Sequence, residues 1–130
     1  MNKVEELMYI IYSLKPTIIC LTETWMDYTV PHNFIVPEGY TLLRKDRSEI
    51  FKQKYGKANG GGIAILHKNN VKVKIKPIAD CEDETLWIEV SMKRTFLVGL
   101  TYRATYIPAN CERRRLQTQQ NVRKCPLNFK

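Results

Sequence analysis

The chain contains no hydrophobic run long enough to cross a membrane as a helix. Its longest apolar stretches are interrupted by Lys15-Pro16 and by Asp27, so none reaches the roughly 20 residues that a membrane-spanning helix requires. The first residues also lack the basic and then apolar regions of a secretory signal peptide. We therefore expect an intracellular protein, nuclear or cytoplasmic, with no membrane partner.

Disulfide and zinc patterns are missing as well. The four cysteines form no Cys-x-x-Cys pair, and neither of the two histidines stands at zinc-ligand spacing from a cysteine. Cys20 lies within an apolar run that predicts a buried strand. We therefore expect free thiols in a reducing compartment and no zinc site. His67 is interpreted as an ordinary residue at the end of a strand.

The length of 130 residues and the hydrophobic content of 44% suit one domain with one core. The net charge of +8 is concentrated in two segments. Residues 40–80 contain ten basic and three acidic residues, a net charge of +7. Residues 106–130 contain six basic residues and one acidic residue, a net charge of +5. Such basicity favours weak electrostatic binding of DNA, although a merely solvated charged face explains it equally well.

Hydrophobic spacing predicts one helix, over residues 2–14, which Lys15-Pro16 ends. Six strands are predicted, over residues 17–22, 39–44, 63–67, 71–76, 86–90 and 96–102. The strand over 17–22 is apolar on both faces, which is typical of a central parallel strand. Turns at Asn69-Asn70 and at residues 91–94 each predict an antiparallel hairpin.

The last part of the chain has a different composition. From about residue 105 there is no apolar periodicity, while arginines and amide side chains accumulate. A chain with so little to bury cannot offset the entropy of ordering. We therefore expect a folded domain over residues 1–105 and a disordered basic tail over residues 106–130.

Two strand ends carry candidate site residues. Glu23 directly follows an apolar strand, the place where sites form in parallel sheets, although an acid there is equally typical of a solvated strand end. Tyr102 ends another apolar strand and is, on its own, more typical of a strand-end aromatic. The tract Gly60-Gly61-Gly62 could cradle a phosphate, but it lacks a P-loop pattern and indicates a hinge where the backbone runs close to a neighbour.

A set of motifs occurs in a fixed order over about residues 2–104. After the helix come Lys-Pro-Thr-Ile-Ile-Cys-Leu-Thr-Glu-Thr-Trp at 15–25, Gly39-Tyr40, Arg44-Lys45-Asp46-Arg47, Gly60-Gly61-Gly62-Ile63-Ala64-Ile65, Leu86-Trp87-Ile88-Glu89-Val90 and Val98-Gly99-Leu100-Thr101-Tyr102-Arg103. This order resembles the endonuclease/exonuclease/phosphatase superfamily, and within it the endonuclease domain of non-LTR (LINE-type) retrotransposons. The resemblance implies an α/β fold, a four-layer sandwich of two mixed sheets with flanking helices, here truncated to its N-terminal half.

The same resemblance implies roles for two residues. Glu23 would bind the catalytic divalent cation, usually Mg²⁺, which polarises the scissile phosphate. Tyr102 would be a catalytic residue beside that phosphate. The family's opening strand with its site asparagine, its Gly-Asp-x-Asn segment, a further aspartate and a terminal Asp-His pair have no counterpart, since no Asp follows Asp83 and no His follows His67.

The sequence therefore predicts a truncated retrotransposon-type, metal-dependent DNA endonuclease domain that is catalytically incomplete alone. Two alternatives remain open at this point. One is a non-catalytic basic module that binds nucleic acid without a metal, and the other is a small interaction protein. Truncation would also leave the apolar faces of residues 17–22 and 96–102 without cover, which predicts self-association.

Overall fold

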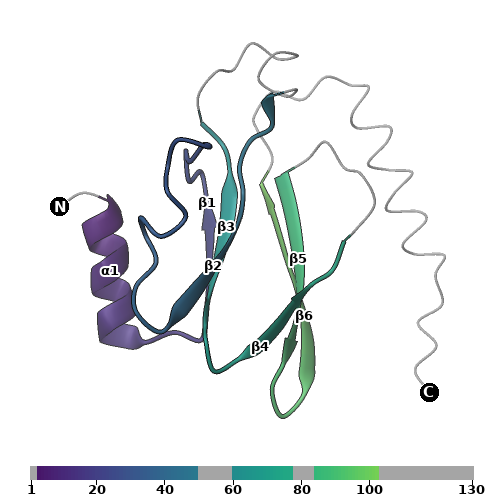
Figure 1. Ribbon diagram of the computed structural model, residues 1–130. Helices are drawn as coiled ribbons and strands as arrows, with labels where there is room; N and C mark the ends of the chain where they lie inside the picture. Colours follow the sequence, from purple (N-terminus) through teal and green to yellow (C-terminus); the bar gives the residue numbers. More distant parts are fainter. Residues whose placement is uncertain (1–2, 50–59, 78–83, 103–130) are drawn as a thin grey trace.

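The computed structural model describes residues 3–49, 60–77 and 84–102, which form one helix and two three-stranded sheets (Figure 1). The elements are α1 (Lys3–Leu14), β1 (Ile18–Thr22), β2 (Tyr40–Lys45), β3 (Ile63–Lys68), β4 (Lys72–Ile75), β5 (Glu84–Ser91) and β6 (Thr95–Tyr102). The first sheet has the strand order β1-β3-β2 and the second β4-β5-β6, with every pair antiparallel. Helix, first sheet and second sheet thus form three successive layers.

α1 covers the outer face of the first sheet. Its apolar stripe includes Ile11, which is 2% exposed and lies in one core with Leu42 of β2 and Leu66 of β3. The helix ends where Lys15 adopts a left-handed φ of 46° and donates its backbone N–H to the carbonyl oxygen of Ile11 at 2.9 Å. Pro16 follows and cannot continue a helix. The predicted helix is therefore confirmed over Lys3–Leu14, and the first residue of the prediction lies outside the described residues.

β3 lies at the centre of the three layers. Ala64 and Leu66 point into the core beneath α1, while Ile63 and Ile65 point into the core between the two sheets, and all four are 0% exposed. On the opposite side of that second core stands Ile88 of β5, also 0% exposed. A strand covered on both faces must be apolar at each covered position, and β3 meets this condition from Ile63 to Leu66.

The prediction of a central parallel strand over residues 17–22 is wrong. Among the described residues, β1 is an edge strand that pairs antiparallel with β3 alone. Ile19 and Leu21 pack on its α1 side, whereas on the other side Ile18 packs against the core between the sheets but Cys20 and Thr22 are exposed. Cys20 is therefore not buried as expected. Because cysteine counts as apolar, the run did not distinguish a strand covered on one face from one covered on both.

The turn at Asn69-Asn70 does not close a hairpin. β3 is paired along both edges by β1 and β2, so it has no free edge for β4, which pairs with β5 in the second sheet. Alternation along β4 turns Val73 toward the core between the sheets and leaves Lys72 and Lys74 exposed. The second predicted hairpin is confirmed, because β5 and β6 pair continuously on either side of their turn.

The fold class is confirmed only in its coarser form. The described residues combine a helix with two sheets packed face to face, but both sheets are antiparallel rather than mixed, and a four-layer sandwich is not confirmed. No described helix has the length and apolar character needed to span a membrane. The tail predicted over residues 106–130 lies outside the described residues.

Part of β6 is uncovered, as predicted for the strand over residues 96–102. Phe96 and Leu97 are 52% and 61% exposed. Edge strands with exposed apolar side chains are prone to pair with another chain. Self-association through this strand stays a prediction.

The position of β3 generates a test of the packing. Ile65→Ala removes methyl groups from the core between the sheets and should lower the free energy of unfolding by about 2–5 kcal/mol. Ile75→Ala is the matched control, because Ile75 on β4 is 51% exposed; it should cost about 1 kcal/mol or less. Urea unfolding followed by circular dichroism measures both, and equal losses would contradict the central placement of β3.

Candidate functional site

Strand ends from both sheets meet at one end of the molecule, the top of Figure 1. β1 and β2 end there and β3 begins there, because Ile63 pairs with Thr22 on one side and with Lys45 on the other. In the second sheet, Glu84 at the start of β5 pairs with Tyr102 at the end of β6. The polar residues that flank these strand ends are therefore brought together at what we call the site end.

Glu23 directly follows β1 at the site end, and its carboxylate is held by two hydrogen bonds. Oε2 accepts one from the indole Nε1 of Trp25 at 2.6 Å and one from the backbone N–H of Gly61 at 3.2 Å. The side chain is exposed to solvent. Since both bonds go to Oε2, Oε1 is left to bind a cation.

The backbone after β1 adopts a strained conformation. Glu23 and Trp25 have φ values of 55° and 56°, in the left-handed region that non-glycine residues rarely adopt. Backbone bonds to the glycine tract hold them there, from Thr24 N–H to Gly62 O at 3.2 Å and from Trp25 N–H to Gly61 O at 2.9 Å. Each such residue costs about 1–3 kcal/mol, and strain of this kind clusters at functional sites.

The glycine tract allows an unusually close approach of three segments. A Cβ on Gly61 would overlap the guanidinium of Arg47, and one on Gly62 would overlap the hydroxyl of Thr24. Both glycines also have positive φ values, 73° and 86°. The predicted close contact with a neighbour is confirmed. β3 rather than a helix follows the tract, so it does not form a P-loop.

A buried ion pair lies behind the glycine tract. Nε of Arg47 donates to Oε1 of Glu84 at 2.8 Å, and the two side chains are 4% and 9% exposed. Charges buried this deeply are tolerated only when paired. The pair therefore ties the end of β2 to the start of β5 and holds the flat guanidinium against Gly61.

The sequence contained only a weak signal for this pair. Arg47 belongs to the motif Arg44-Lys45-Asp46-Arg47, whereas Glu84 belongs to no motif. Glu84 occupies an inward-facing position of β5, in line with Leu86 and Ile88. An acid in register with core residues predicts a buried basic partner, and that is the signal that could have identified it.

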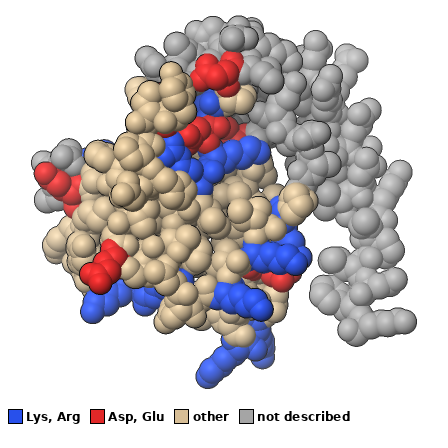
Figure 2. All heavy atoms as spheres, viewed as in Figure 1, with Lys and Arg blue, Asp and Glu red and all other residues tan. Residues whose placement is uncertain are grey.

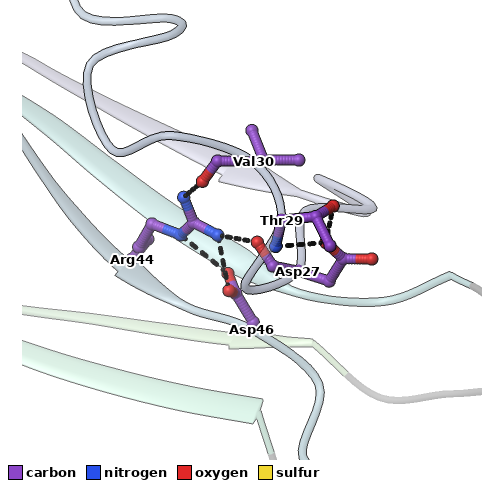
Figure 3. A network of polar contacts seen from close by, with 5 residues as sticks. All are labelled: Asp27, Thr29, Val30, Arg44 and Asp46. Carbon is purple, nitrogen blue, oxygen red and sulfur yellow. Dashed lines mark hydrogen bonds and ion pairs between the residues drawn. The ribbon is translucent and has the colours of Figure 1, made fainter.

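A second polar network fixes the loop that follows Trp25 (Figure 3). Arg44 donates to Asp46 through Nε at 3.0 Å and Nη2 at 2.6 Å, and to the carbonyl oxygens of Asp27 and Val30 at 2.6 and 2.9 Å. The hydrogen bonds to Asp46 raise the pKa of the Arg44 guanidinium, although partial burial opposes them. Arg44 is therefore committed to positioning the loop.

Tyr102 lies at the same end of the molecule as Glu23 but in the other sheet. It is partly buried against the core between the sheets, beside Glu84 on the neighbouring strand. The two sequence-predicted residues are thus linked through Gly61, Arg47 and Glu84, rather than carried by adjacent strands.

The other candidate ligands have ordinary surroundings. His67, 8% exposed near the opposite end of β3, contacts the carbonyl oxygen of Lys68 at 2.9 Å, as expected for a strand-end residue. Desolvation raises the pKa of the Cys20 thiol. A raised pKa disfavours the thiolate, which is the form that binds metals.

The donor set at Glu23 suits one kind of metal site. In the described part of the chain, no three His, Cys, Asp or Glu side chains are grouped to hold a metal. Glu23 therefore offers a single oriented carboxylate. Zinc in structural sites needs four ligands. Mg²⁺ keeps several waters and binds through one or two carboxylates plus substrate phosphates, so Glu23 fits Mg²⁺ and not a structural zinc.

Comparison with known proteins adds no family assignment: no family model matches the chain, and no curated protein matches it. The resemblance to the endonuclease/exonuclease/phosphatase superfamily therefore rests on the order of the sequence motifs alone and stays a prediction.

The buried pair generates the second test. Glu84→Gln removes the charge that Nε of Arg47 is paired with in the core and should lower the free energy of unfolding by about 3 kcal/mol or more. Glu6→Gln is the control, because Glu6 pairs with Lys3 at 3.3 Å on the exposed face of α1. This substitution should lower the free energy of unfolding by less than about 0.5 kcal/mol. Thermal and urea unfolding give both values; similar losses would mean that the Arg47–Glu84 pair does not hold the sheets together.

Proposed function

We propose that this chain carries the cation-binding part of a retrotransposon-type, Mg²⁺-dependent DNA endonuclease site. The observation that supports it is Glu23, a solvent-facing carboxylate fixed by Trp25 and Gly61 at the end of a strand. Glu23 would hold the Mg²⁺, which when bound would supply polarisation of the scissile phosphate and stabilisation of the charge on the leaving oxygen. Tyr102 orients the same phosphate in this proposal.

The residues around Glu23 orient its carboxylate. Trp25 Nε1 and Gly61 N–H both donate to Oε2, so the carboxylate keeps one rotamer and loses little freedom when it binds a ligand. Arg47 and Glu84 support Gly61 from the core. The site is therefore preorganised on its protein side before a cation or a phosphate arrives.

The same residues do not complete a nuclease. Hydrolysis requires a positioned base to activate the attacking water. The sequence has no Asp after Asp83 and no His after His67, which removes the residues that the family uses for this step. We therefore propose that the chain binds the metal and a phosphate but does not cleave DNA alone.

The proposal predicts metal binding without cleavage. Mg²⁺ should shift the NMR resonance of the Trp25 Nε1 proton, because that proton is donated to the ligand carboxylate of Glu23. Glu23→Gln should remove the shift, while Glu38→Gln, a control at an exposed acid in a loop, should not. Nicking of supercoiled plasmid should stay at the level of buffer, since missing acid–base and phosphate ligands cost factors of about 100 to 10,000 each.

Two results would contradict this proposal. An indole resonance that does not respond to Mg²⁺ would show that Glu23 is not a metal ligand. Plasmid nicking that is lost in Glu23→Gln would show that the site is complete.

A second candidate function, a metal-independent nucleic-acid-binding module, is favoured by a row of lysines. Lys72 and Lys74 are exposed on β4, and Lys76, next along the same side, pairs with Glu89 at 3.0 Å. Figure 2 shows basic side chains gathered over β4 at the lower right. Regularly spaced lysines on one face attract phosphates and release counterions when they bind them.

The lysine row predicts salt-dependent binding to duplex DNA that persists in chelator. With around five phosphates neutralised, the slope of log affinity against log salt should be roughly −4 to −5. Lys72→Gln/Lys74→Gln should flatten the slope by about 2, because each phosphate contact contributes about 0.9. Lys3→Gln/Lys15→Gln makes the same charge change at the helix and should have a smaller effect. Equal slopes in the two variants would identify the row as a solvated face.

A further inference from the structure

Trp25 is an exposed aromatic ring that is held rigidly beside Glu23. Its indole is 64% exposed, yet Nε1 donates to Glu23 at 2.6 Å and its backbone N–H donates to Gly61 O at 2.9 Å. The ring also borders Gly60, where an added Cβ would lie 3.6 Å from its Cε2 atom. The Cε2 atom of the indole therefore lies near Gly60, while most of the surface of Trp25 is exposed.

Exposure alone would not mark Trp25, because single exposed apolar residues are common. What distinguishes it is that the chain holds a large apolar ring in water while its own backbone is strained, with a φ of 56°. Trp87 shows the usual arrangement, since its ring lies over Gly99 and is partly buried. A strained and exposed residue next to a candidate phosphate site is better explained by a ligand than by packing.

We propose that the indole face of Trp25 is a stacking platform for an unpaired nucleobase, beside the Glu23 site at which the adjoining phosphate binds when Mg²⁺ is present. This inference rests on the proposed function, because the base belongs to the nucleic-acid substrate of that site. Every base has a flat π face, so stacking on an aromatic side chain binds single strands without reading their sequence. Because Trp25 is already fixed by two hydrogen bonds, it loses little conformational freedom when a base stacks on it.

The structure also indicates which form of nucleic acid fits. In an intact duplex both faces of a base are covered by its neighbours, so only a single strand, an end or a bulge can present a base to the ring. The net charge of +8 favours a polyanion over a protein partner that offers only an apolar contact. The proposed ligand is therefore single-stranded or locally unpaired DNA or RNA.

Fluorescence of Trp25 tests the proposal directly. The chain has two tryptophans, so Trp87→Phe leaves Trp25 as the sole indole reporter. An oligothymidylate should quench it at low salt in chelator, whereas a chain of abasic deoxyribose phosphates of equal length and charge should not. Trp25→Ala, measured by filter binding, should weaken oligothymidylate binding by roughly 5- to 150-fold.

Two further variants serve as controls for the effect of Trp25→Ala. Tyr12→Ala removes another exposed aromatic, 65% exposed on α1, and should leave the affinity unchanged. Trp25→Phe keeps a stacking ring without the indole N–H and should retain more affinity than Trp25→Ala, which separates stacking from any loss of folding. Circular dichroism checks the fold of each variant.

Several outcomes would overturn the stacking site. They are equal quenching by the abasic chain, equal affinity for covalently closed circular duplex and single strand, or equal losses in Trp25→Ala and Tyr12→Ala. The assay contains chelator, so a failure of stacking is distinguishable from a failure of Mg²⁺ binding at Glu23. Quenching by oligothymidylate without a Mg²⁺ response at Glu23 would support the stacking platform and contradict the metal site. A Mg²⁺ response without quenching would support the metal site and contradict the stacking platform.

Discussion

The burial of β3 on both faces is the constraint on which the rest of the structure depends. Its side chains alternate between the core beneath α1 and the core between the sheets, and its edges are occupied by β1 and β2. The chain therefore has to leave the first sheet after Asn69-Asn70 and build a second one. At its other end, β3 begins directly after the glycine tract, so the strand that organises both cores also positions the backbone that holds Glu23.

The Arg47–Glu84 pair connects this core to the site end. Buried ion pairs are weak evidence for stability, because desolvation offsets most of the attraction. Here the geometry explains the pair better than a stabilising role does. An apolar pair in its place would fill the space but would not present a flat cation to Gly61, whose N–H in turn holds Glu23. Three successive contacts thus connect the core to the carboxylate: Glu84 with Arg47, Arg47 with Gly61, and Gly61 with Glu23.

The sequence predicted the features that depend on neighbouring residues and missed those that depend on contacts between distant segments. The helix over residues 2–14 and all six strands were found close to their observed limits, because periodicity is a local property. Strand order was missed, since pairing depends on which faces distant segments cover, and Asn69-Asn70 has the same turn chemistry in a hairpin and in a crossing between sheets. Glu23 was found by its place after a strand. Glu84 was missed because nothing local marks its partner.

Glu23 and Trp25 cannot act independently if both proposals hold. The indole N–H is donated to the same carboxylate that would bind the cation, at 2.6 Å, and both residues share one strained turn of backbone. A cation that draws charge from the carboxylate weakens that hydrogen bond and loosens the ring, and a base that fixes the ring in that hydrogen bond in turn makes the carboxylate a weaker cation ligand. Linkage requires each ligand to change the affinity of the other by the same factor. The Trp25–Glu23 hydrogen bond would carry that coupling, so the order in which metal and nucleic acid bind would not alter the final affinity of the complex.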